Sequence, residues 1–187
     1  LGADMLVLHV DVLSNSAVTA NPSDRCYHCK NTLFRQILRA AENDGFPVLL
    51  DGTNASDDAG DRPGMRALRE LSVRSPLREC GLTKAEIRRL SRDAGLFTWD
   101  KPAYACLATR IRTGEEITLQ KLRQTEKAEG FLFGLGFRDF RVRMVGNTAK
   151  LELREANLPL LLENREKIVT ELRKDYDSVM LNLEVRK

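Results

Sequence analysis

Apolar and polar positions in the first half of the chain alternate between the strand period and the helix period. The apolar, partly β-branched run at residues 5–10 predicts a strand, and Pro47–Leu50 predicts a second, shorter one. Between them, residues 32–43 place apolar side chains on one helical face, and Gly45 marks the end of that helix. The alternation predicts an α/β fold with a parallel sheet.

The same alternation continues to about residue 95. Residues 67–71 predict a short helix, and residues 72–77 predict a strand with its exit loop. A capping box from Thr83 to Glu86 opens a further helix, which ends at Gly95.

The second half has the pattern of a small α+β domain. A long helix over residues 118–135 precedes a strictly alternating strand over 140–145, and Gly146-Asn147 predicts a two-residue hairpin turn. After the turn we expect a partner strand, an amphipathic helix and a final strand, at residues 149–154, 158–172 and 178–185.

The change of pattern predicts two domains. We place the boundary in the irregular region around Thr113–Glu116, so that the domains comprise residues 1–115 and 116–187.

Composition limits the class of protein. Of the 187 residues, 42% are apolar and 30% are charged, which is typical of a soluble globular protein. No apolar run reaches the length of a membrane span, and a net charge of +3 is too small to indicate nucleic-acid binding. We therefore expect neither a membrane nor a nucleic acid as partner.

The first residues lack the basic segment of a signal peptide, which favours a cytoplasmic, reducing compartment. The chain begins on Leu1 rather than Met, as a fragment would. In a reducing compartment cysteines serve metal binding or catalysis more often than disulfides.

Three of the four cysteines form the most specific chemical pattern in the chain. Cys26 and Cys29 have C-x-x-C spacing at the start of the helix predicted over 32–43, where the helix N-terminus favours thiolates. Cys106 lies in the irregular stretch 101–112. Thiolates bind zinc or iron–sulfur clusters, and a three-cysteine site leaves one metal position open. The remaining cysteine, Cys80, is interpreted as a structural thiol.

Other interpretations of these cysteines stay open. Cys106 also suits a nucleophile or sulfur carrier, and Lys101, Arg110 and Arg112 would lower its pKa if they folded close to it. A buried loop cysteine would explain the same residue. A zinc site completed by His28 is a further alternative, although His28 lies between the two cysteines and its geometry would be poor.

A polar loop, Asp51–Asp58, directly follows the strand predicted at 47–50. In open α/β sheets ligands bind at the carboxyl ends of strands, Gly52 permits close backbone approach, and the acids could hold Mg²⁺ through water. A solvated polar loop accounts for the same composition.

Two arginines, Arg141 and Arg143, share one face of the strand predicted over 140–145. Paired guanidinium groups can hold a phosphate or carboxylate, and Glu152 on the partner strand could orient one of them. The alternative is an exposed cross-strand ion pair of little energetic value.

The ordered set of these motifs resembles the ATP-dependent sulfur transferases of the LarE family, within the PP-loop ATP pyrophosphatase superfamily. The resemblance covers essentially the whole chain, and its specificity lies in the order of the motifs. They are Cys26-Tyr27-His28-Cys29-Lys30, Leu50-Asp51-Gly52-Thr53-Asn54, Arg62-Pro63-Gly64, Ser75-Pro76-Leu77, Lys101-Pro102-Ala103-Tyr104-Ala105-Cys106-Leu107-Ala108-Thr109-Arg110 and Phe140-Arg141-Val142-Arg143.

The resemblance implies sulfur insertion during synthesis of a nickel-pincer nucleotide cofactor. ATP adenylates the carboxylate of a pyridinium mononucleotide, pyrophosphate leaves, and sulfur then displaces AMP to give a thiocarboxylate. In one branch of the family a single cysteine, matched by Cys106, gives up its sulfur. In the other branch three cysteines, matched by Cys26, Cys29 and Cys106, hold a [4Fe-4S] cluster, and this chain resembles that branch.

The resemblance also implies roles for further residues. Arg110 and Glu129 would take part in catalysis beside Cys106, and the Asp51, Gly52 and Asn54 positions would lie near ATP and Mg²⁺. Homo-oligomers are expected on the same ground. The substrate site would be completed by Arg141, Arg143 and Glu152, with the arginines on the mononucleotide phosphate.

One departure from the family pattern matters. The N-terminal SGGxDS phosphate-binding loop does not occur in this sequence, so we expect a truncated PP-loop domain that does not activate a carboxylate by itself. Two alternative functions remain open. A PP-loop tRNA thiolase or related adenylating enzyme would bind RNA, and a non-catalytic module would hold zinc in place of iron and sulfide.

Overall fold

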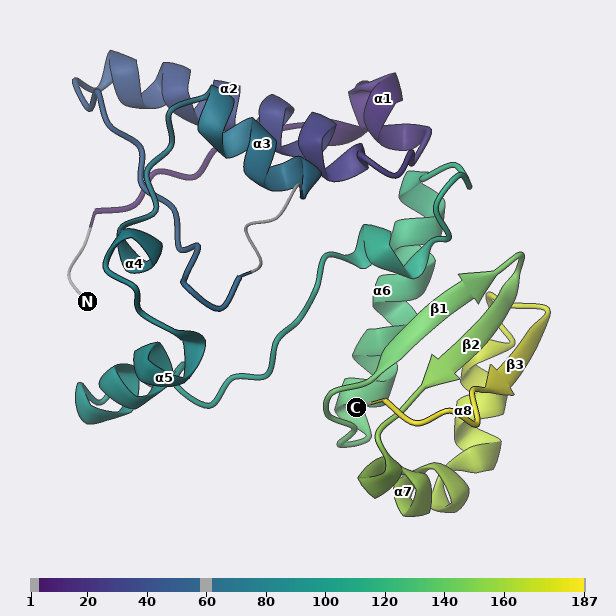
Figure 1. The fold of residues 1–187 in the computed structure, drawn as a ribbon. Helices are drawn as coiled ribbons and strands as arrows, with labels where there is room; N and C mark the ends of the chain where they lie inside the picture. Colours follow the sequence, from purple (N-terminus) through teal and green to yellow (C-terminus); the bar gives the residue numbers. More distant parts are fainter. Residues whose placement is uncertain (1–3, 58–61, 187) are drawn as a thin grey trace. The chain divides into compact units, whose positions relative to one another are not determined.

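The computed structural model describes residues 4–57 and 62–186, and the chain divides into two compact units, Leu1–Lys101 and Pro102–Lys187 (Figure 1). The sequence interpretation placed the boundary after residue 115. The structure gives the segment from Pro102 onward to the second unit, because its side chains bond to a helix and a strand of that unit.

The first unit consists of helices joined by loops. Helix α2 begins at Arg25, earlier than the start predicted from apolar spacing, so both Cys26 and Cys29 lie in its first turns. Helix α3 (Pro63–Glu70) packs along α2, and Tyr27 of α2 donates a 2.7 Å hydrogen bond to Glu70 of α3. The described helical segments of this unit are η1 (Val12–Ser14), α1 (Ser16–Thr19), α2 (Arg25–Asn43), α3 (Pro63–Glu70), α4 (Pro76–Glu79) and α5 (Lys84–Asp93).

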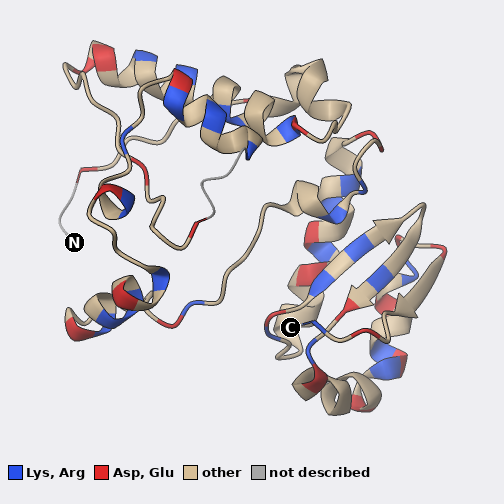
Figure 2. Ribbon diagram, in the orientation of Figure 1, with Lys and Arg blue, Asp and Glu red and all other residues tan. Residues whose placement is uncertain are grey.

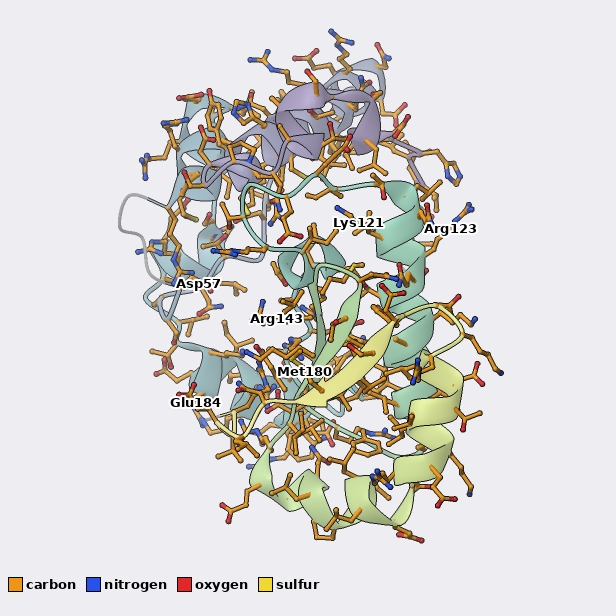
Figure 3. The ribbon with its side chains drawn as sticks, turned by 90° about the vertical axis from the view of Figure 1, so that its right-hand side faces the viewer. Asp57, Lys121, Arg123, Arg143, Met180 and Glu184 are labelled. Atoms are coloured by element: carbon orange, nitrogen blue, oxygen red, sulfur yellow. The ribbon has the colours of Figure 1, made fainter. Side chains whose placement is uncertain are left out.

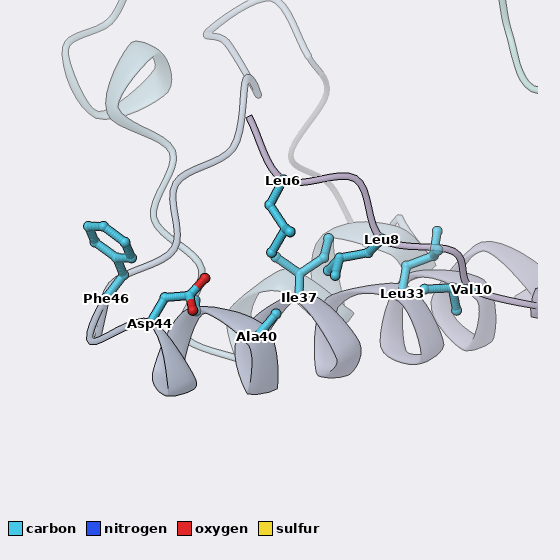
Figure 4. A pocket seen from close by; sticks show the side chains of 9 residues that line it. Leu6, Leu8, Val10, Leu33, Ile37, Ala40, Asp44 and Phe46 are labelled. Carbon is cyan, nitrogen blue, oxygen red and sulfur yellow. The ribbon is translucent and has the colours of Figure 1, made fainter. Parts of the chain in front are cut away.

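The segment predicted as the first strand does not form one. Residues 5–10 have no strand assignment and run along α2 instead. Figure 4 shows alternate side chains of this segment, Leu6 and Leu8, turned toward Leu33 and Ile37 of α2. They line an open apolar hollow of about 450 Å³. The alternating apolar side chains of this segment therefore face a helix rather than belong to a strand in a sheet.

The other two strands predicted for this unit meet in one isolated parallel bridge between Leu50 and Arg74. The bridge has the expected direction, with Asp51 N–H donating to the Arg74 carbonyl at 2.9 Å. Within the described part of the unit the pairing goes no further, so the parallel sheet and its PP-loop architecture stay predictions. The helix at Thr83 is confirmed, and its capping box with Glu86 forms as expected.

The second unit has the predicted α+β arrangement. Strands β1 (Arg141–Val145) and β2 (Thr148–Glu152) pair antiparallel across the Gly146-Asn147 turn, where Gly146 has a φ of +58°. Strand β3 (Ser178–Leu181) pairs parallel to β2, which gives the order β1-β2-β3. The helical segments are η2 (Leu107–Arg110), α6 (Leu119–Gly134), η3 (Glu155–Asn157), α7 (Leu158–Glu163) and α8 (Arg165–Leu172).

One predicted helix is two helices. The pattern over residues 158–172 is interrupted at Asn164, which is not helical (φ −104°, ψ 12°) and separates α7 from α8. The buried Asn164 side chain donates to the Leu160 carbonyl at 3.0 Å. Short polar side chains that bond the preceding turn compete with helix propagation, which explains the break.

The core of the second unit lies between α6 and the sheet. Four apolar side chains here are fully buried: Leu132 of α6, Phe137 and Phe140 in the segment before β1, and Val142 of β1. The rings of Phe133 and Phe140 lie 4.7 Å apart in a tilted arrangement favoured by aromatic pairs. Within the residues that the structure describes, none of the helices combines the length and apolar character needed to span a bilayer.

Candidate functional site

Cys106 occupies a defined turn at the edge of the second unit. It is the N-cap of η2, with φ −49° and ψ 134°, and its thiol is exposed and outside any disulfide. Its carbonyl accepts hydrogen bonds from the Thr109 N–H at 2.9 Å and the Thr109 hydroxyl at 2.7 Å. The turn thus holds Cys106 at the surface while the following residues enter the core.

The buried carboxylate of Glu129 on α6 anchors this turn. Both residues of its ion pair with Arg110 are at most 1% exposed. Arg110 donates from Nε to Oε1 at 2.6 Å and from Nη2 to Oε2 at 3.0 Å, a bidentate pair. The same carboxylate accepts from the Val142 backbone at 2.9 Å and from the Tyr104 hydroxyl at 2.5 Å. Four donors satisfy one buried carboxylate, the condition under which burying such a charge is tolerated.

The two predicted anion-binding arginines also contact the Cys106 segment. Arg141, 6% exposed, donates to the carbonyls of Phe140 at 2.6 Å and Ala103 at 3.0 Å. Arg143, labelled in Figure 3, donates to the Thr109 carbonyl at 2.6 Å and to Glu152 at 2.8 Å. Their positions on β1 are the basic segments of that strand in Figure 2. Backbone on both sides of Cys106 is therefore fixed by β1.

The electrostatics of this cluster follow from its burial. Burial of the phenol and its hydrogen bond to Glu129 raise the pKa of Tyr104 to about 12. Burial, together with the nearby charge of Arg110, lowers the pKa of Arg141 from its ordinary value. The site therefore holds a neutral Tyr104 at neutral pH.

The other two predicted ligands belong to the first unit. Cys26 is exposed and its Sγ accepts from Arg25 Nη2 at 3.4 Å, while Cys29, one helical turn further along α2, is half-buried. Positions three apart lie on the same side of a helix. Among the described residues of either unit, no group of three or more His, Cys, Asp or Glu side chains is arranged to hold a metal ion.

The loop predicted to lie near nucleotide is tied to its own backbone. Asp51 accepts from the Ser75 hydroxyl at 2.6 Å and from the Thr53 hydroxyl at 2.5 Å. Burial acts to raise the pKa of Asp51, but these hydrogen bonds and the charge of Lys30 outweigh it and lower the pKa. A second carboxylate, Asp57, accepts from the Asn54 N–H at 2.9 Å.

Two further positions of that loop are Gly52 and Asp58. A Cβ added at Gly52 would meet no atom within 4 Å, so the backbone there is accessible. Asp58, the last residue of the predicted loop, lies outside the described residues. The role of Asp51, Gly52 and Asn54 near a nucleotide stays a prediction.

The structure brings together six of the predicted residues: Cys106, Arg110, Glu129, Arg141, Arg143 and Glu152. Sequence reasoning missed Tyr104 and Thr109 as members of this cluster. The signal for Tyr104 was weak, because its partner Glu129 is 25 residues away on a helix. A tyrosine two positions before the candidate cysteine was the only hint.

The chain is similar in sequence to known proteins. No protein-family model matches the chain. It is 41% identical over 147 residues, 79% of its length, to the uncharacterized protein slr1717 of Synechocystis sp.. It is 33% identical over 158 residues, 84% of its length, to the pyridinium-3,5-bisthiocarboxylic acid mononucleotide synthase (LarE) of Lactiplantibacillus plantarum.

A third relative is matched over more of its own length. The chain is 31% identical over 180 residues, 95% of its length, to the uncharacterized protein MJ0830 of Methanocaldococcus jannaschii, and covers 70% of that protein. It spans only 55% and 57% of the cyanobacterial protein and the synthase. Because it is 31% identical to MJ0830 and covers 70% of that protein, the chain belongs to the same family as MJ0830.

Proposed function

We propose that this chain carries the sulfur-transfer part of an enzyme of nickel-pincer cofactor synthesis. The Lactiplantibacillus relative is named as the synthase of a pyridinium bisthiocarboxylic acid mononucleotide, so the substrate here would be the corresponding pyridinium carboxylate mononucleotide. The observation that carries the proposal is the exposed Cys106 thiol on a turn fixed by the buried Arg110–Glu129 pair. A sulfur donor must reach a carboxyl carbon, and a rigid turn at the surface provides that reach.

The proposed reaction replaces one carboxyl oxygen by sulfur. ATP, with Mg²⁺, supplies the activated substrate as an acyl-adenylate, and the Asp51–Asn54 loop is proposed to lie near that nucleotide. A sulfide, which the cluster described below would supply when bound, would form a C–S bond at the carbonyl carbon, and the C–O bond to AMP would break. AMP departs with the bonding electron pair, which balances the step without an external oxidant or reductant.

The donor set fits an iron–sulfur cluster in its chemistry. Cys26 and Cys106 present exposed thiols, and Cys29 lies one turn from Cys26 on α2. These three thiolates would hold a [4Fe-4S] cluster, and three ligands leave one iron without a protein ligand. When bound, the cluster would supply a transferable sulfide.

Arg143 is better placed than Arg141 to meet a substrate phosphate. The Arg143 side chain is 41% exposed although it bonds Glu152 and the Thr109 carbonyl. Arg141 is nearly buried and already donates to two carbonyls. We propose that Arg143 binds the mononucleotide phosphate, with Glu152 orienting it, and that Arg141 acts mainly by holding the segment before Cys106.

The test is product formation from a preformed substrate. The protein is incubated with the acyl-adenylate of a pyridinium carboxylate mononucleotide, and mass spectrometry detects replacement of oxygen by sulfur. Thiocarboxylate should form with the parent protein and with Cys80→Ser, and should be lost with Cys106→Ser. Equal product from Cys106→Ser would remove Cys106 from the reaction.

A further inference from the structure

The chain after β3 stays beside β2 and the residues that follow it, but it does not continue as a regular strand (Figure 1). The Asn182 N–H donates to the Leu151 carbonyl at 2.8 Å, and the Arg186 N–H donates to the Leu153 carbonyl at 2.8 Å. The bonds of a parallel pair are evenly spaced, so a regular continuation would bring residue 184, not 186, to Leu153. Two extra residues are therefore taken up between these bonds, as in a β-bulge, and a bulge redirects the side chains next to it.

This path brings the Arg186 side chain to two carboxylates at the ends of neighbouring strands. Its Nη2 donates to Asp139 Oδ1 at 3.4 Å, and its Nη1 lies 3.9 Å from Glu152 Oε2. Asp139 lies shortly before β1, and Glu152 is the last residue of β2. The Glu152 side chain is only 14% exposed, so its charge needs a partner. Because a guanidinium group is planar and carries several fixed N–H donors, Arg186 can hold both carboxylates at once.

Glu152 also holds the arginine that we propose for the substrate phosphate. The Arg143 Nε donates to the same carboxylate oxygen, Oε2, at 2.8 Å, and Lys150 Nζ lies 4.0 Å from Oε1. Among the described residues, three cationic side chains therefore lie within 4.0 Å of this one carboxylate. This part of the sheet keeps positive charge after Glu152 is neutralised, which favours an anion. A turn of the Glu152 carboxylate would also redirect the Arg143 guanidinium.

We propose that Arg186 is a positioning residue for anion binding by Arg143. It acts through Glu152: the Arg186 guanidinium holds the carboxylate, and the carboxylate fixes the direction of Arg143. A side chain that is held in its binding direction before the ligand arrives loses less entropy on binding. The inference rests on the proposed function for the identity of the anion, the phosphate of a pyridinium carboxylate mononucleotide. In this arrangement Arg186 does not itself contact the phosphate.

Calorimetric titration with two ligands that differ only in the phosphate tests the proposal. The ligands are nicotinic acid mononucleotide, which is a pyridinium carboxylate mononucleotide, and its riboside, which lacks the phosphate. Arg186→Gln should raise the Kd of the mononucleotide by about tenfold, a typical coupling between residues in contact. The Kd of the riboside should not change. Arg186→Lys keeps the charge but not the planar group that spans both carboxylates, so it should raise the Kd of the mononucleotide less.

A double-mutant cycle separates action through Glu152 from direct contact with the ligand. In a Glu152→Ala background, Arg186→Gln should change the Kd of the mononucleotide by less than about twofold, because the carboxylate on which Arg186 acts is gone. Arg154→Gln is the matched control, since Arg154 pairs with the same Asp139 but acts at that end of the bridge. It should also leave the Kd within about twofold of the parent value. Circular dichroism checks that each variant is folded.

Each outcome decides the role of Arg186. An unchanged Kd in Arg186→Gln, an equal loss of affinity for the riboside, an effect that persists without Glu152, or absence of mononucleotide binding would overturn the proposal. The expected pattern of Kd values without any thiocarboxylate product would keep the role of Arg186 and reject the proposed sulfur transfer. Thiocarboxylate product together with an unchanged Kd in Arg186→Gln would keep the sulfur transfer and reject the role of Arg186.

Discussion

At the scale of single residues, Glu129 is the centre of the second unit. Its carboxylate accepts from Arg110, Tyr104 and the Val142 backbone while shielded from water. A buried ion pair adds little net stability, but loss of one partner leaves a buried charge without compensation. The residue that organises the Cys106 turn is therefore also the one whose loss should be most damaging.

Glu129→Gln should destabilise the protein by about 3–5 kcal/mol, because Arg110 remains charged and buried without a carboxylate. The free energy of urea unfolding, followed by circular dichroism, measures the effect. Glu126→Gln is the matched control, since Glu126 is exposed on the same helix α6. It should change stability by no more than about 0.5 kcal/mol. Similar losses for the two variants would show that the pair is not a buried anchor.

Tyr104 predicts a pH dependence at the alkaline end. Its folded pKa is raised to about 12 from 10.0, so the neutral phenol is favoured by folding. The folded state binds the proton more tightly than the unfolded state. The stabilisation is therefore complete below pH 10 and is lost as pH rises from 10 through 12. Stability of the parent protein should fall more steeply over this range than that of Tyr104→Phe. Parallel pH curves for the two proteins would rule out this contribution.

The contacts between individual residues were the part of the site that the sequence predicted least well. The motif order placed Cys106, Arg110 and Glu129 in one candidate site. It gave no indication that Arg141 binds the Ala103 carbonyl or that Tyr104 reaches Glu129. Those contacts depend on how a loop folds onto a helix and a strand far along the chain, which no local periodicity encodes.

At the scale of elements, predictions from sequence were reliable where interactions between residues close in the chain determine the element. The capping box at Thr83 and the hairpin turn at Gly146-Asn147 form as predicted, because cap and turn chemistry is local. The segment at residues 5–10 did not form a strand: a strand needs a neighbouring strand, and alternate side chains of this segment line an open hollow beside α2 instead. Asn164 split a helix that apolar spacing alone had joined.

The cap of α5 gives a prediction at this scale. The Thr83 hydroxyl accepts from the Glu86 N–H, and the Glu86 carboxylate accepts from the Thr83 N–H at 2.8 Å. Thr83→Ala should destabilise α5 by about 1 kcal/mol, whereas Thr83→Ser keeps the oxygen and should be nearly neutral. Hydrogen exchange of the α5 amides compares the variants. If Thr83→Ser increased the exchange rate of the α5 amides as much as Thr83→Ala does, the result would argue against the cap.

At the scale of the whole molecule, the chain has two compact units that each carry part of the proposed chemistry. The first holds Cys26 and Cys29, and the second holds Cys106 with its anchored turn. Motif order suggested the three-cysteine pattern from sequence alone. The chemical identity of the group on these thiols depends on metal supply and assembly, which neither periodicity nor side-chain packing determines.

The metal and sulfide content of the anaerobically purified protein tests the central claim most directly. We predict about four irons and at least four acid-labile sulfides per chain, with loss of the cluster in Cys106→Ala and retention in Cys80→Ala. Zinc in place of iron, or iron content unchanged in Cys106→Ala, would contradict a cluster held by Cys26, Cys29 and Cys106.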